Sequence, residues 1–263
     1  MCIDRRDFLK LTSGVAGAAL LTESGALAAT VPESIAQLKP MTAGIAQITD
    51  DERKARIEKA RRLMIENKID AIYLEPGTSM SYYTGVRWGT SERMFALVIP
   101  ARGEPAWICP KFEEERAREL IKFGTDIRTW EEDESPFKLA AQIFKDRGIR
   151  SGRVGIEERV RFFLFDGIRR ETANIEYTIA DPVTAGCRMI KSPAELALMQ
   201  RANDITIEAF KAATATLKEG MTQFEFGANV SAAFKALGSS GGALISFGKY
   251  TAFPHGSVQP QKL

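Results

Sequence analysis

The chain has 263 residues, 44% of them hydrophobic and 27% charged, and this size and balance predict one or two globular domains. Its 36 basic and 34 acidic residues nearly cancel, which leaves a formal net charge of +2. Basic pairs such as Arg61-Arg62 and Arg169-Arg170 lie beside glutamates in helical patterns and indicate solvated helix faces. The composition therefore predicts no nucleic-acid partner.

The first 28 residues have the pattern of an export signal. Arg5-Arg6-Asp7-Phe8-Leu9-Lys10 is followed by an apolar, small-residue stretch over 11–21 and by the cleavage pattern Ala26-Leu27-Ala28. The apolar stretch is shorter than the ~20 residues that a membrane-spanning helix needs. Its Ala, Gly and Leu residues leave no polar face for an amphipathic helix. We therefore predict that residues 1–28 are a twin-arginine signal peptide, read by the Tat export machinery, and that the mature protein is periplasmic or exported.

The first helix of the mature chain is expected after a lead-in over residues 29–44. Asp50 or Asp51 can cap this helix at its N-terminus. Its apolar face recurs with helical spacing and is formed by Ile57, Ala60, Leu63 and Met64. A short buried strand is expected over 71–74, ended by Pro76-Gly77, and a polar loop follows it.

Strands and helices are then expected to alternate as far as residue 185. The runs at 95–99 and 105–109, separated by the turn Pro100-Ala101-Arg102-Gly103, indicate a hairpin. The remaining expected elements are a helix over about 112–123, a strand over 127–130, a helix over 136–147, a strand over 154–156, a helix over 162–170 and a strand over 175–179. This alternation is typical of an α/β domain, here with a mixed sheet over about 45–185.

A domain boundary is expected between residues 185 and 186, where Asp181-Pro182-Val183 closes the first domain. Ser192-Pro193-Ala194-Glu195 then opens a long helix. The Ser192 hydroxyl can accept a hydrogen bond from the Glu195 amide, while the Glu195 carboxylate accepts one from the Ser192 amide. Pro193 occupies a position that needs no amide. We therefore expect Glu195 to cap this helix and assign it no catalytic role.

A second helix and the beginning of a sheet are expected to follow. Thr222-Gln223-Phe224-Glu225 repeats the capping-box pattern, and Gly238-Ser239-Ser240-Gly241-Gly242 ends the helix. Residues 243–247 are apolar and are expected to begin the sheet that carries the pocket. Two helices and one strand would leave apolar helix faces exposed to water, so we expect the natural reading frame to continue past Leu263.

The chain offers few residues for nucleophilic or metal chemistry. Its one histidine, His255, is flanked by proline and glycine, and that context is typical of a turn. Cys109 lies in an apolar strand, and we expect it and Cys187 to be unpaired thiols. Neither has a neighbouring histidine, so a cysteine nucleophile or a zinc site has little support.

Four segments carry a resemblance to a known family. Gly241–Gly248, followed by Phe253-Pro254-His255-Gly256-Ser257, resembles the entry to the active site of the pita-bread metallopeptidases, which include Xaa-Pro aminopeptidases, prolidases and creatinase. Arg188–Glu195 is similar to the entry of the pita-bread domain. Tyr82-Tyr83-Thr84-Gly85-Val86 and Gly155-Ile156-Glu157 resemble parts of the creatinase N-terminal domain. The resemblance implies a creatinase-type N-terminal α/β domain over 45–185 and the truncated start of a pita-bread α+β peptidase domain over 186–263.

The resemblance also implies a site and its cofactors. In that family the histidine matching His255 lies in the substrate pocket, and the Asp, Asp, His, Glu and Glu metal ligands come later in the chain. His255 is therefore the expected catalytic and substrate-binding residue, forming a hydrogen bond to the substrate or intermediate. Two divalent metal ions (Mn, Co or Zn) are expected in the full-length protein and none on this chain alone. The expected partners are a peptide with proline at its second position and, for the full-length protein, a second subunit in a homodimer.

Three functions stay open on the sequence alone. The first is the N-terminal part of an exported Xaa-Pro aminopeptidase or prolidase-like metallopeptidase, inactive as a fragment. The second is a metal-free creatinase-like amidinohydrolase or a lyase, and the third is a non-catalytic binding module. The residues after Leu263 would separate them, because five metal ligands favour the first, other polar residues the second and apolar residues the third.

Overall fold

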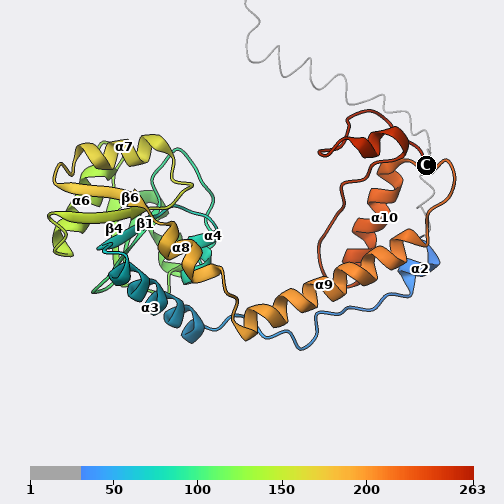
Figure 1. The fold of residues 1–263 in the computed structure, drawn as a ribbon, viewed down its shortest axis with the longest axis horizontal. Helices are drawn as coiled ribbons and strands as arrows, with labels where there is room; N and C mark the ends of the chain where they lie inside the picture. Colours follow the sequence, from blue (N-terminus) through green and yellow to red (C-terminus); the bar gives the residue numbers. More distant parts are fainter. Residues whose placement is uncertain (1–30) are drawn as a thin grey trace, which may run out of the picture. The chain divides into compact units, whose positions relative to one another are not determined.

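The computed structural model describes residues 31–263, which divide into two compact units (Figure 1). One unit comprises residues 44–201, and the other joins residues 31–43 to residues 202–263. The predicted signal peptide, residues 1–28, lies outside the described residues. The domain boundary that the sequence places between residues 185 and 186 stays a prediction. Within the described part of the chain, no helix is long and apolar enough to span a bilayer.

The unit of residues 44–201 is built on a six-stranded sheet with the order β4-β3-β2-β1-β5-β6. The strands are β1 (Ala71–Leu74), β2 (Ala96–Pro100), β3 (Ala106–Pro110), β4 (Asp126–Trp130), β5 (Gly152–Ile156) and β6 (Ile175–Ile179). β2 runs antiparallel to β1 and β3, and every other neighbouring pair is parallel. The expected α/β fold with a mixed sheet is therefore confirmed.

Helices cover both faces of this sheet. They are α3 (Asp50–Glu66), α4 (Thr78–Thr84), α5 (Glu114–Leu120), α6 (Pro136–Asp146), α7 (Phe162–Arg170) and α8 (Asp181–Arg188), with a 3-10 turn η1 (Lys111–Glu113) before α5. One core contains residues of α3, α4, α5 and α8, and the other contains residues of α6 and α7. In β1, Ile72 and Leu74 belong to the first core and Ala71 and Tyr73 to the second, as the strand period of two requires.

Most of the expected elements of this unit are confirmed, including the helix that carries Ile57 and Met64, the hairpin and the 162–170 helix. The expected cap of the first helix is wrong. Thr49, and neither Asp50 nor Asp51, accepts the Glu52 amide, at 3.1 Å. The helix expected over about 112–123 is shorter, because residues 111–113 form η1 and α5 ends at Leu120.

Two helices occupy segments that the sequence assigns to connections. The expected polar loop after β1 contains α4, and the segment expected to close the first domain is the start of α8. Serine, threonine and tyrosine give α4 a weak helical propensity. Burial of Ser79, Met80, Tyr83 and Thr84 stabilises it instead. Tertiary packing therefore overrides the local signal.

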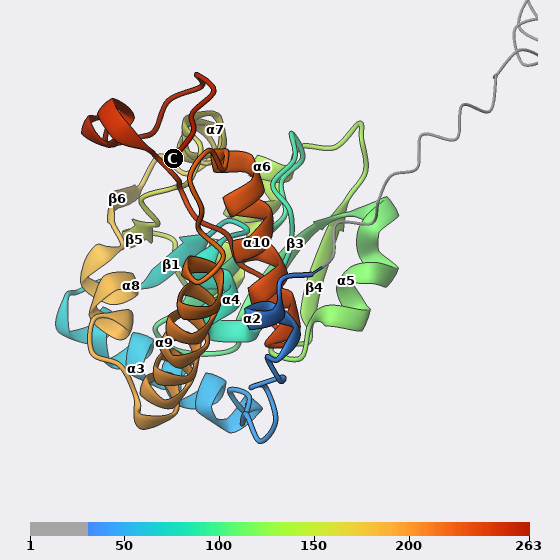
Figure 2. The ribbon, with the colours of Figure 1, turned by 90° about the vertical axis from the view of Figure 1, so that its right-hand side faces the viewer.

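The second unit contains α2 (Glu33–Ala36), the C-terminal part of α9 (Pro193–Thr214), α10 (Gln223–Ala236) and the 3-10 turn η2 (Gly248–Ala252). α9 and α10 pack together around a core that includes Ile205, Ala209, Val230 and Phe234 (Figure 2). The expected capping box of α10 is confirmed, because the Thr222 amide donates to Glu225 at 2.8 Å and the Glu225 amide donates to Thr222 at 3.2 Å.

The strand expected over residues 243–247 is wrong, since this segment has no regular secondary structure. A strand is stabilised by ladder hydrogen bonds to a neighbour along its length. In this unit, within the described residues, strand pairing is limited to a single bridge between Thr222 and Lys262. The Phe247 amide donates instead to the side chain of Gln261, at 2.7 Å.

Candidate functional site

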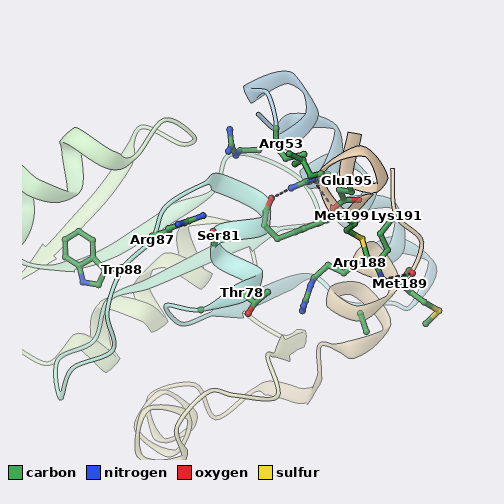
Figure 3. Close-up of a pocket in the computed structure, with 16 residues that line it drawn as sticks. Arg53, Thr78, Ser81, Arg87, Trp88, Arg188, Met189, Lys191, Glu195 and Met199 are labelled. Carbon is green, nitrogen blue, oxygen red and sulfur yellow. Dashed lines mark hydrogen bonds and ion pairs between the residues drawn. The ribbon is translucent and has the colours of Figure 1, made fainter. Parts of the chain in front are cut away.

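A hollow with a cavity volume of about 1060 Å³ opens on the unit of residues 44–201 (Figure 3). Its wall is formed by α3, α4, α8 and the first turns of α9, and Gly77 and Thr78 bring it close to the carboxyl end of β1. Ligands of α/β sheets commonly bind outside the carboxyl ends of the strands. Its charged residues are Arg53, Arg56, Arg87, Arg188, Lys191 and Glu195. Positive charge therefore dominates the wall of this hollow.

Arg56 is the centre of a polar cluster at one side of the hollow. Its Nη2 atom donates to Glu52 at 3.2 Å and to Glu195 at 3.0 Å, while its Nη1 atom donates to the Tyr82 carbonyl at 2.9 Å. The Ser192 hydroxyl donates to Glu52 at 2.8 Å. These five residues, the Arg56 clasp, connect α3, α4 and the beginning of α9.

Glu195 has two roles in the Arg56 clasp. Its carboxylate accepts the Ser192 amide at 2.8 Å, and its own amide donates to the Ser192 hydroxyl at 3.2 Å, so the expected capping box is confirmed. The same carboxylate also forms the ion pair with Arg56. The sequence predicts the cap, but it does not predict this second contact, because Arg56 and Glu195 lie 139 positions apart.

Tyr82 forms the aromatic part of the clasp. The Arg56 guanidinium carbon lies 4.1 Å from the centre of its ring, and its hydroxyl donates to the Cys187 carbonyl at 3.1 Å. Burial raises the pKa of Tyr82 to about 12, with Glu195 adding to the shift and Arg56 opposing it. Tyr82 is therefore a neutral hydrogen-bond donor at neutral pH.

Gly85 follows α4 as its C-cap residue and is the glycine of the segment Tyr83-Thr84-Gly85. It has a φ of +78°, which glycine adopts without the steric cost of a side chain. A Cβ atom there would lie 2.8 Å from Nε of Arg53, which lines the hollow. The glycine therefore allows Arg53 to pack directly over the backbone.

Two buried carboxylates follow the carboxyl ends of β1 and β5. Glu75 accepts hydrogen bonds from Arg161, at 2.6 Å from Nη2 and 2.8 Å from the backbone amide, so its role is structural. Glu157 is 7% exposed, and burial raises its pKa, while Ser79 and Arg188 oppose the shift. Glu157 is therefore a buried acid directly after β5. Its position after a strand was predictable from the sequence, but its burial was not.

The environment of the two cysteine thiols does not activate them for catalysis. Cys109 and Cys187 are buried and are not joined in a disulfide. Burial raises the pKa of Cys109 to about 12 and also raises the pKa of Cys187. Because the thiolate is the nucleophilic form, neither residue is activated for attack at neutral pH.

His255 lies in an exposed turn of the second unit, with the Gly256 amide donating to the Phe253 carbonyl at 3.0 Å. The turn that its sequence context indicates is confirmed, and its catalytic and substrate-binding role stays a prediction. Among residues 31–263, no three His, Cys, Asp or Glu side chains form a group able to hold a metal ion. The described donor set therefore does not fit a two-metal centre.

Curated relatives of this chain include peptidases of yeast and bacteria. An uncharacterized peptidase of Schizosaccharomyces pombe is 30% identical over 246 residues, which are 88% of this chain and 53% of that protein. An uncharacterized peptidase of Staphylococcus epidermidis is 26% identical over 212 residues, 79% of this chain and 58% of the relative. The chain therefore spans little more than half the length of these relatives.

Solved structures show the same fold. A dipeptidase from Pyrococcus horikoshii matches 69% of this chain and 50% of its own, with 26% identity and a TM-score of 0.61. The dipeptidase PepE from Mycobacterium ulcerans matches 83% of this chain and 59% of its own, with 22% identity and a TM-score of 0.72, and supports the fold. The family model of the creatinase/prolidase N-terminal domain matches residues 56–190. This chain belongs to the creatinase/prolidase family and carries its N-terminal domain.

Proposed function

We propose that this chain is the N-terminal part of a prolidase-like metallopeptidase that hydrolyses the peptide bond preceding a proline. The observation that carries the proposal is the match to the Pyrococcus horikoshii dipeptidase, which covers 69% of the chain at 26% identity. Since the family model ends at residue 190, the likeness to the Schizosaccharomyces pombe peptidase over 246 residues supports a peptidase assignment beyond the N-terminal domain.

In this proposal the described residues supply a scaffold and one substrate contact. The six-stranded unit holds the Arg56 clasp, which fixes the first turn of α9. His255, exposed in its turn, is proposed to form a hydrogen bond to the substrate. Two divalent ions would activate water and polarise the scissile carbonyl, and their ligands would belong to residues outside this chain. The full-length enzyme is proposed to be a homodimer.

The test compares the 263-residue chain with the protein encoded by the complete natural reading frame. With Mn²⁺ or Co²⁺, the complete protein should hydrolyse Ala-Pro and leave Ala-Ala intact, and the shorter chain should be inactive. His255→Ala in the complete protein should lower kcat by about 10²–10⁴-fold while its circular dichroism stays unchanged. Hydrolysis of creatine without metal, or activity of the shorter chain on Ala-Pro, would contradict the proposal.

We also propose export through the twin-arginine pathway. Changing Arg5 and Arg6 together to lysine keeps the charge but removes the pair that the export receptor reads. The double variant should accumulate in the cytoplasm as the uncleaved precursor, which fractionation and blotting would measure. Lys10→Arg, a charge-conserving change in the same segment, should be exported normally. Normal periplasmic levels of the double variant would instead favour a general secretory signal.

A further inference from the structure

The hollow contains cations that the fold does not neutralise. Arg53 forms an ion pair with Asp50 at 3.0 Å, and Arg56 is held by the clasp. By contrast, within the described residues no carboxylate lies within ion-pair distance of Arg87, Arg188 or Lys191. Lys191 donates to the Met189 carbonyl at 3.1 Å. Arg188 favours the ionised form of Glu157 but forms no ion pair with it.

These three cations are distributed along the hollow. Figure 3 places Arg87 beside Trp88 at one end, and Arg188 and Lys191 at the other, with Ser81 between them. The cations of the hollow therefore lie in two groups, one at each end. A ligand that carries several negative charges along an extended backbone can contact both.

Apolar side chains line the hollow at the end that holds Arg188 and Lys191. Met189 is 70% exposed and Met199 is 48% exposed, and Leu198 also belongs to the wall. Methionine side chains adapt to irregular partners, and covering them removes apolar surface from water. A bare polyphosphate has no apolar groups to contact them. An acidic peptide with interspersed apolar side chains matches both the charge and the apolar wall.

We propose that this hollow binds an acidic, amphipathic peptide segment of a partner molecule. The carboxylates contact Arg87 at one end and Arg188 and Lys191 at the other, and the apolar side chains cover Met189 and Met199. The proposal concerns binding only, so it does not depend on the peptidase function.

Fluorescence anisotropy of a labelled hexapeptide of alternating glutamate and leucine, titrated with the whole 263-residue chain, tests the proposal. The peptide should bind saturably, and raising the salt from 50 to about 300 mM should weaken it, because charge pairs at an open surface are screened. Combined Arg188→Gln and Lys191→Gln should weaken binding at least about tenfold, as two charge contacts are lost. Arg87→Gln should weaken it by a smaller factor.

The matched control is Arg102→Gln with Lys145→Gln, two exposed cations outside the hollow. This variant should change the affinity less than about twofold. Three results would overturn the proposal: no saturable binding, equal binding of a lysine–leucine hexapeptide, or complete displacement of the peptide by inorganic phosphate. Loss of binding in a longer natural form of the protein would also overturn it, because the occupant would then be the protein's own chain.

Discussion

Replacing Arg56 by methionine should lower the free energy of unfolding of the 44–201 unit by about 3 kcal/mol, the scale of breaking a buried ion pair. Arg56 is 9% exposed and holds the carboxylates of Glu52 and Glu195. Methionine keeps most of the apolar stem but leaves both carboxylates, each only about one-fifth exposed, without their cation. Urea unfolding followed by tryptophan fluorescence would measure the loss, because Trp88, Trp107 and Trp130 all lie in this unit.

Lys54→Met is the matched control in the same helix. Lys54 pairs with Asp51 at 3.0 Å, but both side chains are exposed, so the change should cost less than about 0.5 kcal/mol. Adding Glu52→Gln and Glu195→Gln to Arg56→Met should recover part of the stability, because the two carboxylate charges left without a cation are then removed. A triple variant no more stable than Arg56→Met would show that lost packing, and not charge, causes the effect.

The sheet could be predicted from the sequence because its strands carry their own signals. Residues 71–74 are buried on both faces of the sheet and form a continuous apolar run. The hairpin of β2 and β3 is marked by the turn at Pro100–Gly103. α4 and α8 carry no such local signal. α4 is short and rich in hydroxyl residues, and its helix is stabilised by burial of side chains such as Met80 and Tyr83, which a linear pattern does not reveal.

The site could be predicted only in part, because some of its contacts join residues that are far apart in the sequence. Capping boxes at Ser192 and Thr222 were predictable, because both partners lie within one helical turn. The Arg56 clasp joins α3 to residues about 140 positions away, so no window of sequence contains it. One signal was nevertheless present. Arg56 and Glu52 lie on the same helix at i, i+4 spacing, with Arg56 beside the buried Ile57 and one turn before Ala60.

Ser79 and Glu157, near the carboxyl ends of β1 and β5, are a second case in which sequence alone does not reveal the environment of a side chain. Glu157 follows a strand, and Ser79 follows another, and the parallel pairing of β1 with β5 brings these strand ends together. Burial, not sequence context, raises the pKa of Glu157. The assignment of residues 243–247 to a strand was wrong for the converse reason: apolar composition indicates burial, whereas a strand also needs a neighbour with which to pair.

Replacing Trp107 by alanine should lower the free energy of unfolding of the same unit by about 3–5 kcal/mol, the usual cost of removing a large buried aromatic side chain. Trp107 is fully buried in β3, paired with Leu97 on one side and Ile127 on the other. Its indole donates to the Phe123 carbonyl at 2.7 Å. The change therefore leaves a cavity and removes the indole N–H group that donates to the buried Phe123 carbonyl.

Trp107→Phe separates these two effects, because phenylalanine fills much of the space but cannot donate a hydrogen bond. It should cost about 1–3 kcal/mol, the penalty for a buried carbonyl left without its partner. Circular dichroism in urea is the suitable measurement, since the substitution removes a fluorescent residue. Phe112→Ala, at a side chain 67% exposed just after β3, should change the stability by no more than about 0.5 kcal/mol. If Trp107→Ala cost no more than Phe112→Ala, β3 would not be a central strand of this sheet, and the core assigned to its face with α3, α4, α5 and α8 would be wrong.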